Sequence, residues 1–337
     1  MYVMAKRPKA DSDASIAAVD DFLAAGGFRR AKRPKGALAR ERGKREARKK
    51  PLRLRAAMPL EVQRVPDLDM KWLAHGFSTR TGGHSTVFGG HDLNLGMQKH
   101  DERRTVEKNR RDFFGAADVT RGFKLVTLKQ IHSATIHVLE KEPKSLLVGD
   151  GVITDRPGLL LSVQTADCVP VLLVDAKRKA IGAFHAGWRG TVKRIVEKGV
   201  GMMAMTYGSD PADIRAAIGP CIQQCCYGVG PEVVDEFHSQ FAYAAKLFKD
   251  MFDDDPVKTK YPLLFLTARA PGHGPVGKQP HLDLTEANRR QLLDAGVKEI
   301  WASGFCTACN TDRLFSHRKE DGFTGRMMAV VGVRAKI

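Results

Sequence analysis

The sequence contains no long hydrophobic run. No apolar stretch in its 337 residues approaches the roughly 20 residues that a membrane-spanning helix needs. The first residues also lack the apolar middle region of a secretory signal. We therefore expect no association with a membrane and a cytoplasmic location.

Cysteine is scarce, and some histidine patterns are missing. Six cysteines are too few for a disulfide scaffold, so an informative cysteine in a reducing cytoplasm is better interpreted as a metal ligand or a catalytic group. No His-x-His pair occurs, which argues against a multicopper oxidase because its coupled coppers are typically held by such pairs. The zinc deaminase signature is also absent, because Ala-Gly follows His185 and three residues separate Cys221 from the next cysteine.

The net charge of +17 is unevenly distributed. Residues 1–55 hold 17 Lys and Arg against 6 Asp and Glu, so most of the positive charge lies in the first sixth of the chain. This composition predicts a disordered tail over residues 1–57 and a folded domain over residues 58–337. The tail can be an arm for nucleic acid, a solvated extension, or a segment upstream of a biological start at Met58. We expect nucleic-acid contact, if there is any, only through this tail.

The folded domain alternates short apolar runs with helical patterns. Apolar runs bounded by turn residues predict strands at 72–79, 125–128, 135–139, 152–154, 159–163, 171–174, 180–184, 214–218, 300–304 and 327–333. Helical periodicity predicts helices at 101–114, with Asp101 as its cap, and at 191–205, 231–249 and 284–295. Several strands follow one another without an intervening helix, which favours a single α/β domain with a mixed sheet.

Three residues in polar turns form a candidate site. His132, Cys168 and His185 each follow a strand-like run. Two imidazoles and a thiolate are a normal zinc ligand set, and three protein ligands with an open fourth position are typical of catalytic zinc. Cys168 and His185 can instead form a thiolate–imidazolium pair for metal-free nucleophilic catalysis. The residues alone do not decide between these hypotheses.

Two further features have a functional and a plain structural interpretation. Cys221, Cys225 and Cys226, together with Cys306-x2-Cys309, can supply four thiolates for a structural zinc, or they can be small buried residues at strand ends. Arg80 precedes Gly82-Gly83, and this turn can surround an anion or be an ordinary hairpin turn.

Several sequence blocks resemble the laccase-domain purine nucleoside phosphorylases, formerly described as polyphenol oxidases. The resemblance covers residues 72–334 and rests on blocks in the same order: His75-Gly-Phe-Ser-Thr-Arg-Thr-Gly-Gly83, Leu128-Lys-Gln-Ile-His-Ser133, Thr165-Ala-Asp-Cys-Val-Pro170, His185-Ala-Gly-Trp-Arg-Gly-Thr191, Ile218-Gly-Pro-Cys-Ile222, Leu282-Asp-Leu284, and Phe315-Ser-His-Arg318 followed by Gly325-Arg326. The long basic N-terminus and His317, where an aromatic residue is common, depart from the family pattern.

The resemblance implies a fold, a metal and a reaction. It implies a single-domain α/β–β–α fold related to the catalytic domain of cytotoxic necrotizing factor. It implies zinc, with copper as the alternative metal, on His132, Cys168 and His185. It also implies phosphorolysis of adenosine, inosine and methylthioadenosine, with adenosine deamination as a further activity. Arg80 and Gln130 are the candidate substrate contacts. The rival hypotheses are a copper-dependent polyphenol oxidase and a metal-free Cys–His amidase-type enzyme.

Overall fold

The computed structural model describes residues 54–119, 122–252 and 278–335. The basic tail predicted over residues 1–57 therefore lies outside the described residues, except for its last four. Arg55 donates hydrogen bonds to the carboxylate of Asp92, so contacts with the folded part occur three residues before Met58. None of the described helices is long and apolar enough to cross a membrane.

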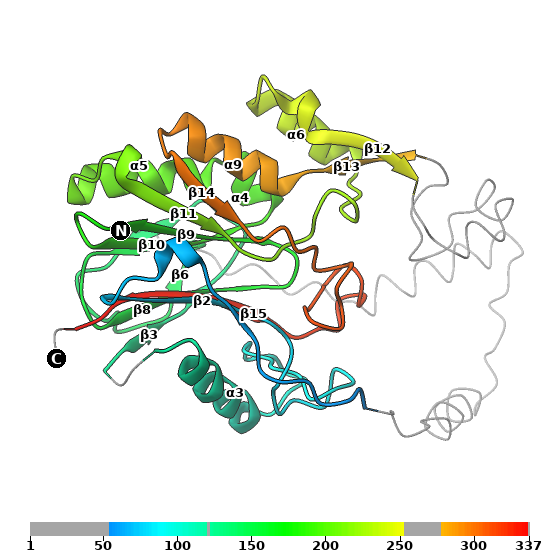
Figure 1. Cartoon of the computed structure of the whole chain (residues 1–337). Helices are drawn as coiled ribbons and strands as arrows, with labels where there is room; N and C mark the ends of the chain where they lie inside the picture. The colour runs from blue at the N-terminus through cyan, green and yellow to red at the C-terminus, as the bar shows by residue number, and fades with distance from the viewer. Residues whose placement is uncertain (1–53, 120–121, 253–277, 336–337) are drawn as a thin grey trace, which may run out of the picture. The chain divides into compact units, whose positions relative to one another are not determined.

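Two mixed β-sheets form the centre of the fold (Figure 1). The first sheet has the strand order β1 (Val62–Gln63), β2 (Leu73–Ser78), β15 (Met327–Val333), β8 (Leu159–Thr165) and β3 (Lys124–Val126). The second has the order β14 (Glu299–Ala302), β11 (Ile214–Ile218), β9 (Val169–Asp175), β10 (Ala180–Ala186), β7 (Gly151–Thr154) and β5 (Ile136–Val138). Most neighbours are antiparallel, and the pairs β3–β8, β5–β7 and β11–β14 are parallel. The predicted mixed α/β class is confirmed.

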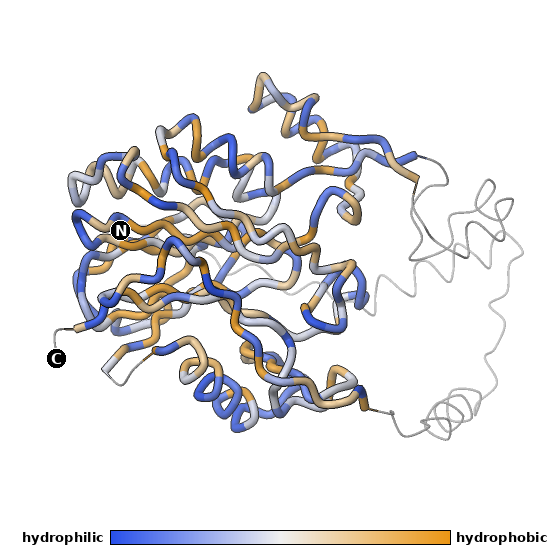
Figure 2. The backbone as a smooth tube through the Cα atoms, in the orientation of Figure 1, coloured by the Kyte–Doolittle hydropathy of each residue, from blue (hydrophilic) through white to orange (hydrophobic). Residues whose placement is uncertain are grey.

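The two sheets pack against each other through a shared apolar core. Leu161 and Val163 of β8 belong to the same buried cluster as Leu172 and Val174 of β9. Figure 2 shows hydrophobic residues concentrated along these central strands. The inner face of each sheet is buried in this core, and helices cover the outer faces. Burial on both faces explains why the strands are continuous apolar runs rather than alternating patterns.

Helices cover the outer faces of the sheets and complete four layers. The second sheet is covered by α4 (Trp188–Val192), α5 (Ile195–Tyr207), α6 (Pro231–Gln240) and α9 (Leu284–Asp294). The first sheet packs against α3 (Arg103–Ala116), whose Phe113 is buried in one cluster with Leu160 of β8. The shorter elements are η1 (Pro66–Leu68), η2 (Pro211–Asp213), η3 (Ala244–Leu247), β4 (Leu128–Lys129), β6 (Leu147–Val148), β12 (Phe248–Phe252) and β13 (Lys278–Leu282).

Two predicted helices are shorter than expected. The helix expected at 191–205 is divided into α4 and α5, because Arg194 between them adopts a left-handed conformation with φ of 60°. The helix expected at 231–249 ends at Gln240. Asp101 is not the N-cap of α3, because the N-cap position is taken by Glu102. The Asp101 carboxylate accepts hydrogen bonds from Ser85 Oγ (2.6 Å), Asn94 Nδ2 (2.8 Å) and the Glu102 N–H (3.0 Å).

Candidate functional site

The topology of the second sheet brings the candidate residues together. Strand β10 is antiparallel to both β7 and β9, so its end lies beside the beginnings of its two neighbours. His185 lies near this end, Asp150 directly precedes β7, and Cys168 directly precedes β9. Contrary to the prediction, His185 is the penultimate residue of β10 rather than part of the following turn. A rigid strand therefore fixes its position.

Asp150 is the hydrogen-bonding centre of the site. Its carboxylate has no solvent exposure and accepts from Nδ1 of His185 (2.8 Å). It also accepts from the backbone N–H groups of Ile131 (3.2 Å), His132 (3.0 Å) and Ser133 (2.6 Å), and from Ser133 Oγ (2.7 Å). These bonds hold His132 in a left-handed conformation, with φ of 58°, that a histidine rarely adopts. One buried carboxylate thus positions both histidines.

The three predicted ligands converge. One donor atom from each of His132, Cys168 and His185 lies within 4.8 Å of the other two. Sγ of Cys168 is 3.8 Å from Nε2 of His132, and the imidazole rings are 4.9 Å apart at an angle of 72°. Because Nδ1 of His185 is bonded to Asp150, its Nε2 remains for a metal or a proton.

The electrostatics of the site favour a thiolate. Burial alone would raise the pKa of Cys168, but the charge of His185 and hydrogen bonds from both histidines lower it to about 6. Burial opposes the charged form of His185, but the charge of Cys168 and the bond to Asp150 raise its pKa to about 9. The pKa of Asp150 lies far below its usual range, because the bonds from His185 and Ser133 outweigh its burial. A thiolate is the form of cysteine that binds a metal or attacks a substrate.

A cavity opens over the three residues. Its volume is about 330 Å³, and its other walls are Leu128, Gln130, Gln164, Thr165, Ala166, His317 and Arg326. Gly187 adjoins two of these residues, since a Cβ at this position would lie 3.0 Å from Sγ of Cys168 and 3.0 Å from Cδ2 of His132. The backbone beside the ligand atoms thus leaves no room for an additional side chain.

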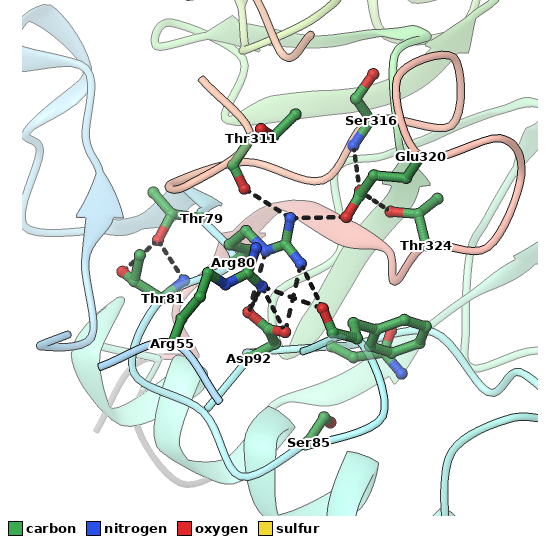
Figure 3. A network of polar contacts seen from close by, with 12 residues as sticks. Arg55, Thr79, Arg80, Thr81, Ser85, Asp92, Thr311, Ser316, Glu320 and Thr324 are labelled. Atoms are coloured by element: carbon green, nitrogen blue, oxygen red, sulfur yellow. Dashed lines mark hydrogen bonds and ion pairs between the residues drawn. The ribbon is translucent and has the colours of Figure 1, made fainter. Parts of the chain in front are cut away.

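Arg80 does not line this cavity, and the expected anion contact is not supported. Its side chain is fully buried and donates to Asp92 (3.0 and 3.3 Å), to Glu320 (2.9 Å) and to the carbonyl oxygens of Thr311 and Phe88 (Figure 3). These partners occupy all its N–H groups. Arg80 therefore fixes the loop that carries His317 and Arg326 rather than contacting a ligand itself.

Gln130 lines the cavity, but its amide is largely engaged. Its Nε2 donates to the carbonyl oxygen of Gln164 (2.8 Å), and its Oε1 accepts from the N–H of Gln164 (2.8 Å). The side chain thus pairs with the backbone at the end of β8. The Gln130 side chain therefore holds the segment that precedes His132 against β8.

Sequence reasoning missed three residues of the site. Asp150 lies in a Gly-Asp-Gly turn, and its place directly before the buried strand β7 is a signal for a functional residue. His317 and Arg326 come from a loop more than 130 residues after His185, and no local spacing relates them to the ligands.

Comparison with known proteins places this arrangement in a family. Residues 74–334 match the model of the family described as multi-copper polyphenol oxidoreductase laccase. The chain belongs to this family. A purine nucleoside phosphorylase from Deinococcus radiodurans is 35% identical over 280 residues, which cover 81% of this chain and 93% of the relative. The purine nucleoside phosphorylase YlmD from Geobacillus stearothermophilus is 35% identical over 285 residues, covering 78% of this chain and 94% of the relative.

The solved structures agree with the fold. The crystal structure of YlmD from Geobacillus stearothermophilus aligns with a TM-score of 0.67 at 32% identity, covering 84% of this chain and 99% of the other. The structure of YfiH from Bacillus licheniformis aligns with a TM-score of 0.65 at 33% identity, covering 78% of this chain and 94% of the other. The four-layer arrangement therefore belongs to a folded domain that these two bacterial proteins share.

Proposed function

We propose that this chain is a zinc-dependent purine nucleoside phosphorylase. The proposed substrates are adenosine, inosine and methylthioadenosine together with phosphate, and the proposed further activity is adenosine deamination. The observation that carries the proposal is the convergence of His132, Cys168 and His185 in an open cavity, within a chain whose relatives are named purine nucleoside phosphorylases.

The residues fit a zinc ion. Two imidazole nitrogens and one thiolate come from three separate segments, and Asp150 leaves Nε2 of His185 facing its two partners. Three protein ligands with cavity space beside them are typical of a catalytic rather than a structural zinc. Bound zinc would supply a Lewis acid beside the substrate. The protein's own part is to hold His132 and His185 rigidly through Asp150.

Arg326 is the candidate phosphate contact. It lies on the cavity wall, where only its Nη1 donates to described residues, namely to the carbonyl oxygens of Thr324 (3.3 Å) and Gly325 (2.9 Å). Nε and Nη2 remain able to form the two parallel hydrogen bonds by which a guanidinium binds phosphate. Phosphorolysis needs an anion positioned beside the sugar, and this charge can position it. The proposal therefore moves the anion contact from Arg80 to Arg326, with His317 and Gln130 beside the nucleoside.

Product analysis tests the proposal. Adenosine is incubated with the purified protein with and without phosphate, and the wild type is compared with Cys168→Ala. We expect phosphate-dependent adenine and ribose 1-phosphate from the wild type and none from the variant. Cys221→Ser is the matched control, since Cys221 is buried away from the cavity. Inosine formed without phosphate would indicate that deamination is the main reaction. No turnover of any purine nucleoside by zinc-loaded protein would refute the proposal.

Metal-free cysteine catalysis is the second candidate. The Asp150 carboxylate orients His185, and His185 lies beside the thiol of Cys168, as in a carboxylate–imidazole–nucleophile triad. The lowered pKa of Cys168 suits a nucleophile. His132 favours the metal, because a nucleophilic pair does not need a second imidazole at the sulfur. The copper-dependent polyphenol oxidase is less well supported, since the described residues offer no further cluster of histidines for coupled coppers. Turnover that survives complete chelation would favour the amidase-type hypothesis.

The proposal includes a cytoplasmic location. All six cysteines of the chain are free thiols in the structure. Such thiols persist in a reducing compartment. Cell fractionation with an antibody against the chain would test this part.

A further inference from the structure

Four cysteines form a second cluster, separate from the first. Cys225 and Cys226 lie in the segment after β11, and Cys306 and Cys309 lie in the segment after β14. Their four sulfur atoms all lie within 4.8 Å of one another. None of these residues lines the cavity over His132, Cys168 and His185.

The backbone brings the two segments together independently of the sulfurs. Cys221 and Cys306 form a parallel backbone bridge. The Cys221 N–H donates to the carbonyl oxygen of Phe305 (3.4 Å), and the Thr307 N–H donates to the carbonyl oxygen of Cys221 (3.1 Å). Backbone hydrogen bonds therefore hold the two segments together without any bond between the thiols. The cysteines project from this pairing into one region.

The sulfur spacing fits a tetrahedral metal and not a disulfide. Sγ of Cys309 lies 3.3 Å from that of Cys226 and 3.6 Å from that of Cys225. Four sulfurs each about 2.3 Å from a central zinc would be about 3.8 Å apart. A disulfide bond is only about 2.05 Å long. The N–H groups of Gln223, Ala308 and Cys309 also point at the sulfur of Cys306, and such donors stabilise a thiolate.

Cys221 does not take part, although the sequence placed it in this group. It is fully buried, and its sulfur contacts Thr285 Oγ1 (3.2 Å) and Gln223 Nε2 (3.2 Å). Its sulfur is not among the four that lie within 4.8 Å of one another, so Cys221 remains a core residue beside the cluster.

We infer that Cys225, Cys226, Cys306 and Cys309 bind a second, structural zinc ion. Four cysteine ligands leave no open position, which is the arrangement of a structural site. The Cys306-x2-Cys309 spacing is typical of zinc-binding turns. The inference does not depend on the proposed nucleoside chemistry.

The second site would stabilise the loops behind Cys168. The carbonyl of Asp167 accepts from Ile222 N–H (2.9 Å), and its carboxylate accepts from Thr307 Oγ1 (2.6 Å) and from Arg318 N–H (2.6 Å). Asp167 adjoins Cys168 and has a φ of 94°, which a non-glycine residue adopts only under constraint. A zinc that fastens the two cysteine segments would keep these partners in place.

Metal content of the full-length protein tests the inference. The protein is expressed with added zinc, purified under reducing conditions and analysed by mass spectrometry of the metal. We expect two zinc ions per chain in the wild type and one in the Cys225→Ser/Cys309→Ser double variant. Both substituted residues are exposed, so serine leaves no buried unpaired hydroxyl. The matched control, Cys221→Ser, should retain two.

Cobalt titration of Cys168→Ala isolates the second site. In this variant the first site has lost its thiolate, so a strong thiolate-to-cobalt charge-transfer band can come only from the cluster. We expect the band at one equivalent of Co²⁺ and its loss when Cys225→Ser/Cys309→Ser is added. Absence of the band, or a two-dalton mass loss from a disulfide in metal-free protein, would overturn the inference. Neither readout requires nucleoside turnover, so failure of the proposed function would leave this test intact.

Discussion

The most informative single substitution is Asp150→Asn. The Asp150 carboxylate has no solvent exposure and accepts hydrogen bonds from His185, from Ser133 Oγ and from three successive backbone N–H groups. Asparagine has almost the same shape but only one acceptor oxygen. Its NH₂ group would face N–H donors, so at least two of these bonds would be lost.

The structure sets the size of the expected effect. A hydrogen bond to a charged group contributes about 1.5–3 kcal/mol, so loss of two such bonds should lower the free energy of unfolding by about 3–6 kcal/mol. The second effect is on metal affinity. Partners that orient a metal-binding histidine typically change that affinity by about 10–100-fold, and Asp150 also fixes the backbone of His132. We therefore expect Asp150→Asn to weaken zinc binding by about 100-fold or more.

Two measurements check this prediction. Urea unfolding of the metal-free proteins gives the stability change, and zinc competition with a chelator gives the affinity. Asp175→Asn is the matched control, because Asp175 is equally buried at the other end of β9 and its Oδ1 accepts from Lys177 and Arg178 N–H groups. Asparagine can keep both of these bonds with its single oxygen. Wild-type zinc affinity in a folded Asp150→Asn protein would refute the view that Asp150 organises the site.

Three further predictions follow from other residues. Gly187→Ala should weaken zinc binding about 10-fold with little change in urea stability, because the new Cβ would crowd Cys168 and His132 at 3.0 Å; unchanged chelator competition would contradict it. Burial lowers the pKa of His75 to about 4, and its Nε2 accepts the Val65 N–H, so protonation favours unfolding. Stability from this residue is complete above about pH 6.5 and falls by about 3 kcal/mol as the pH drops toward 4. Urea unfolding at neutral pH and near pH 4 should therefore show a smaller loss for His75→Gln than for the wild type. Phe113→Ala should cost about 3–5 kcal/mol in the same assay, since Phe113 is fully buried, whereas the exposed Phe252→Ala should cost little.

The sequence predicted the strands around the site because these strands are buried on both faces. The runs at 159–163, 171–174 and 180–184 lie within β8, β9 and β10, and continuous burial makes such runs easy to recognise. The helix boundaries were less predictable. Arg194 interrupts the helix after Thr191 because its guanidinium bonds to the carbonyl of Gln240 and to Glu197, and the Gln240 contact depends on tertiary structure.

The expectation for Arg80 failed for a similar reason. Beside Gly82-Gly83, an unpaired arginine would be a reasonable anion contact. Its carboxylate partners are Asp92, 12 residues away, and Glu320, 240 residues away. A pairing over such a distance in the sequence cannot be seen in a local pattern, and it consumes the donors that an anion would need. Arg326 was only part of a sequence block, yet it reaches the cavity.

The cysteines show why residue type alone could not assign the site. Cys168 and Cys221 both follow a polar or glycine-containing turn, yet their pKa values move in opposite directions. Hydrogen bonds and charge from His132 and His185 lower the first to about 6, whereas burial without a cationic partner raises the second to about 12. The fold around Cys168 supplies partners for a thiolate charge, and the fold around Cys221 does not. At Cys168 these partners are imidazoles held by Asp150, so the chemistry of the sulfur depends on a carboxylate 18 residues earlier in the chain.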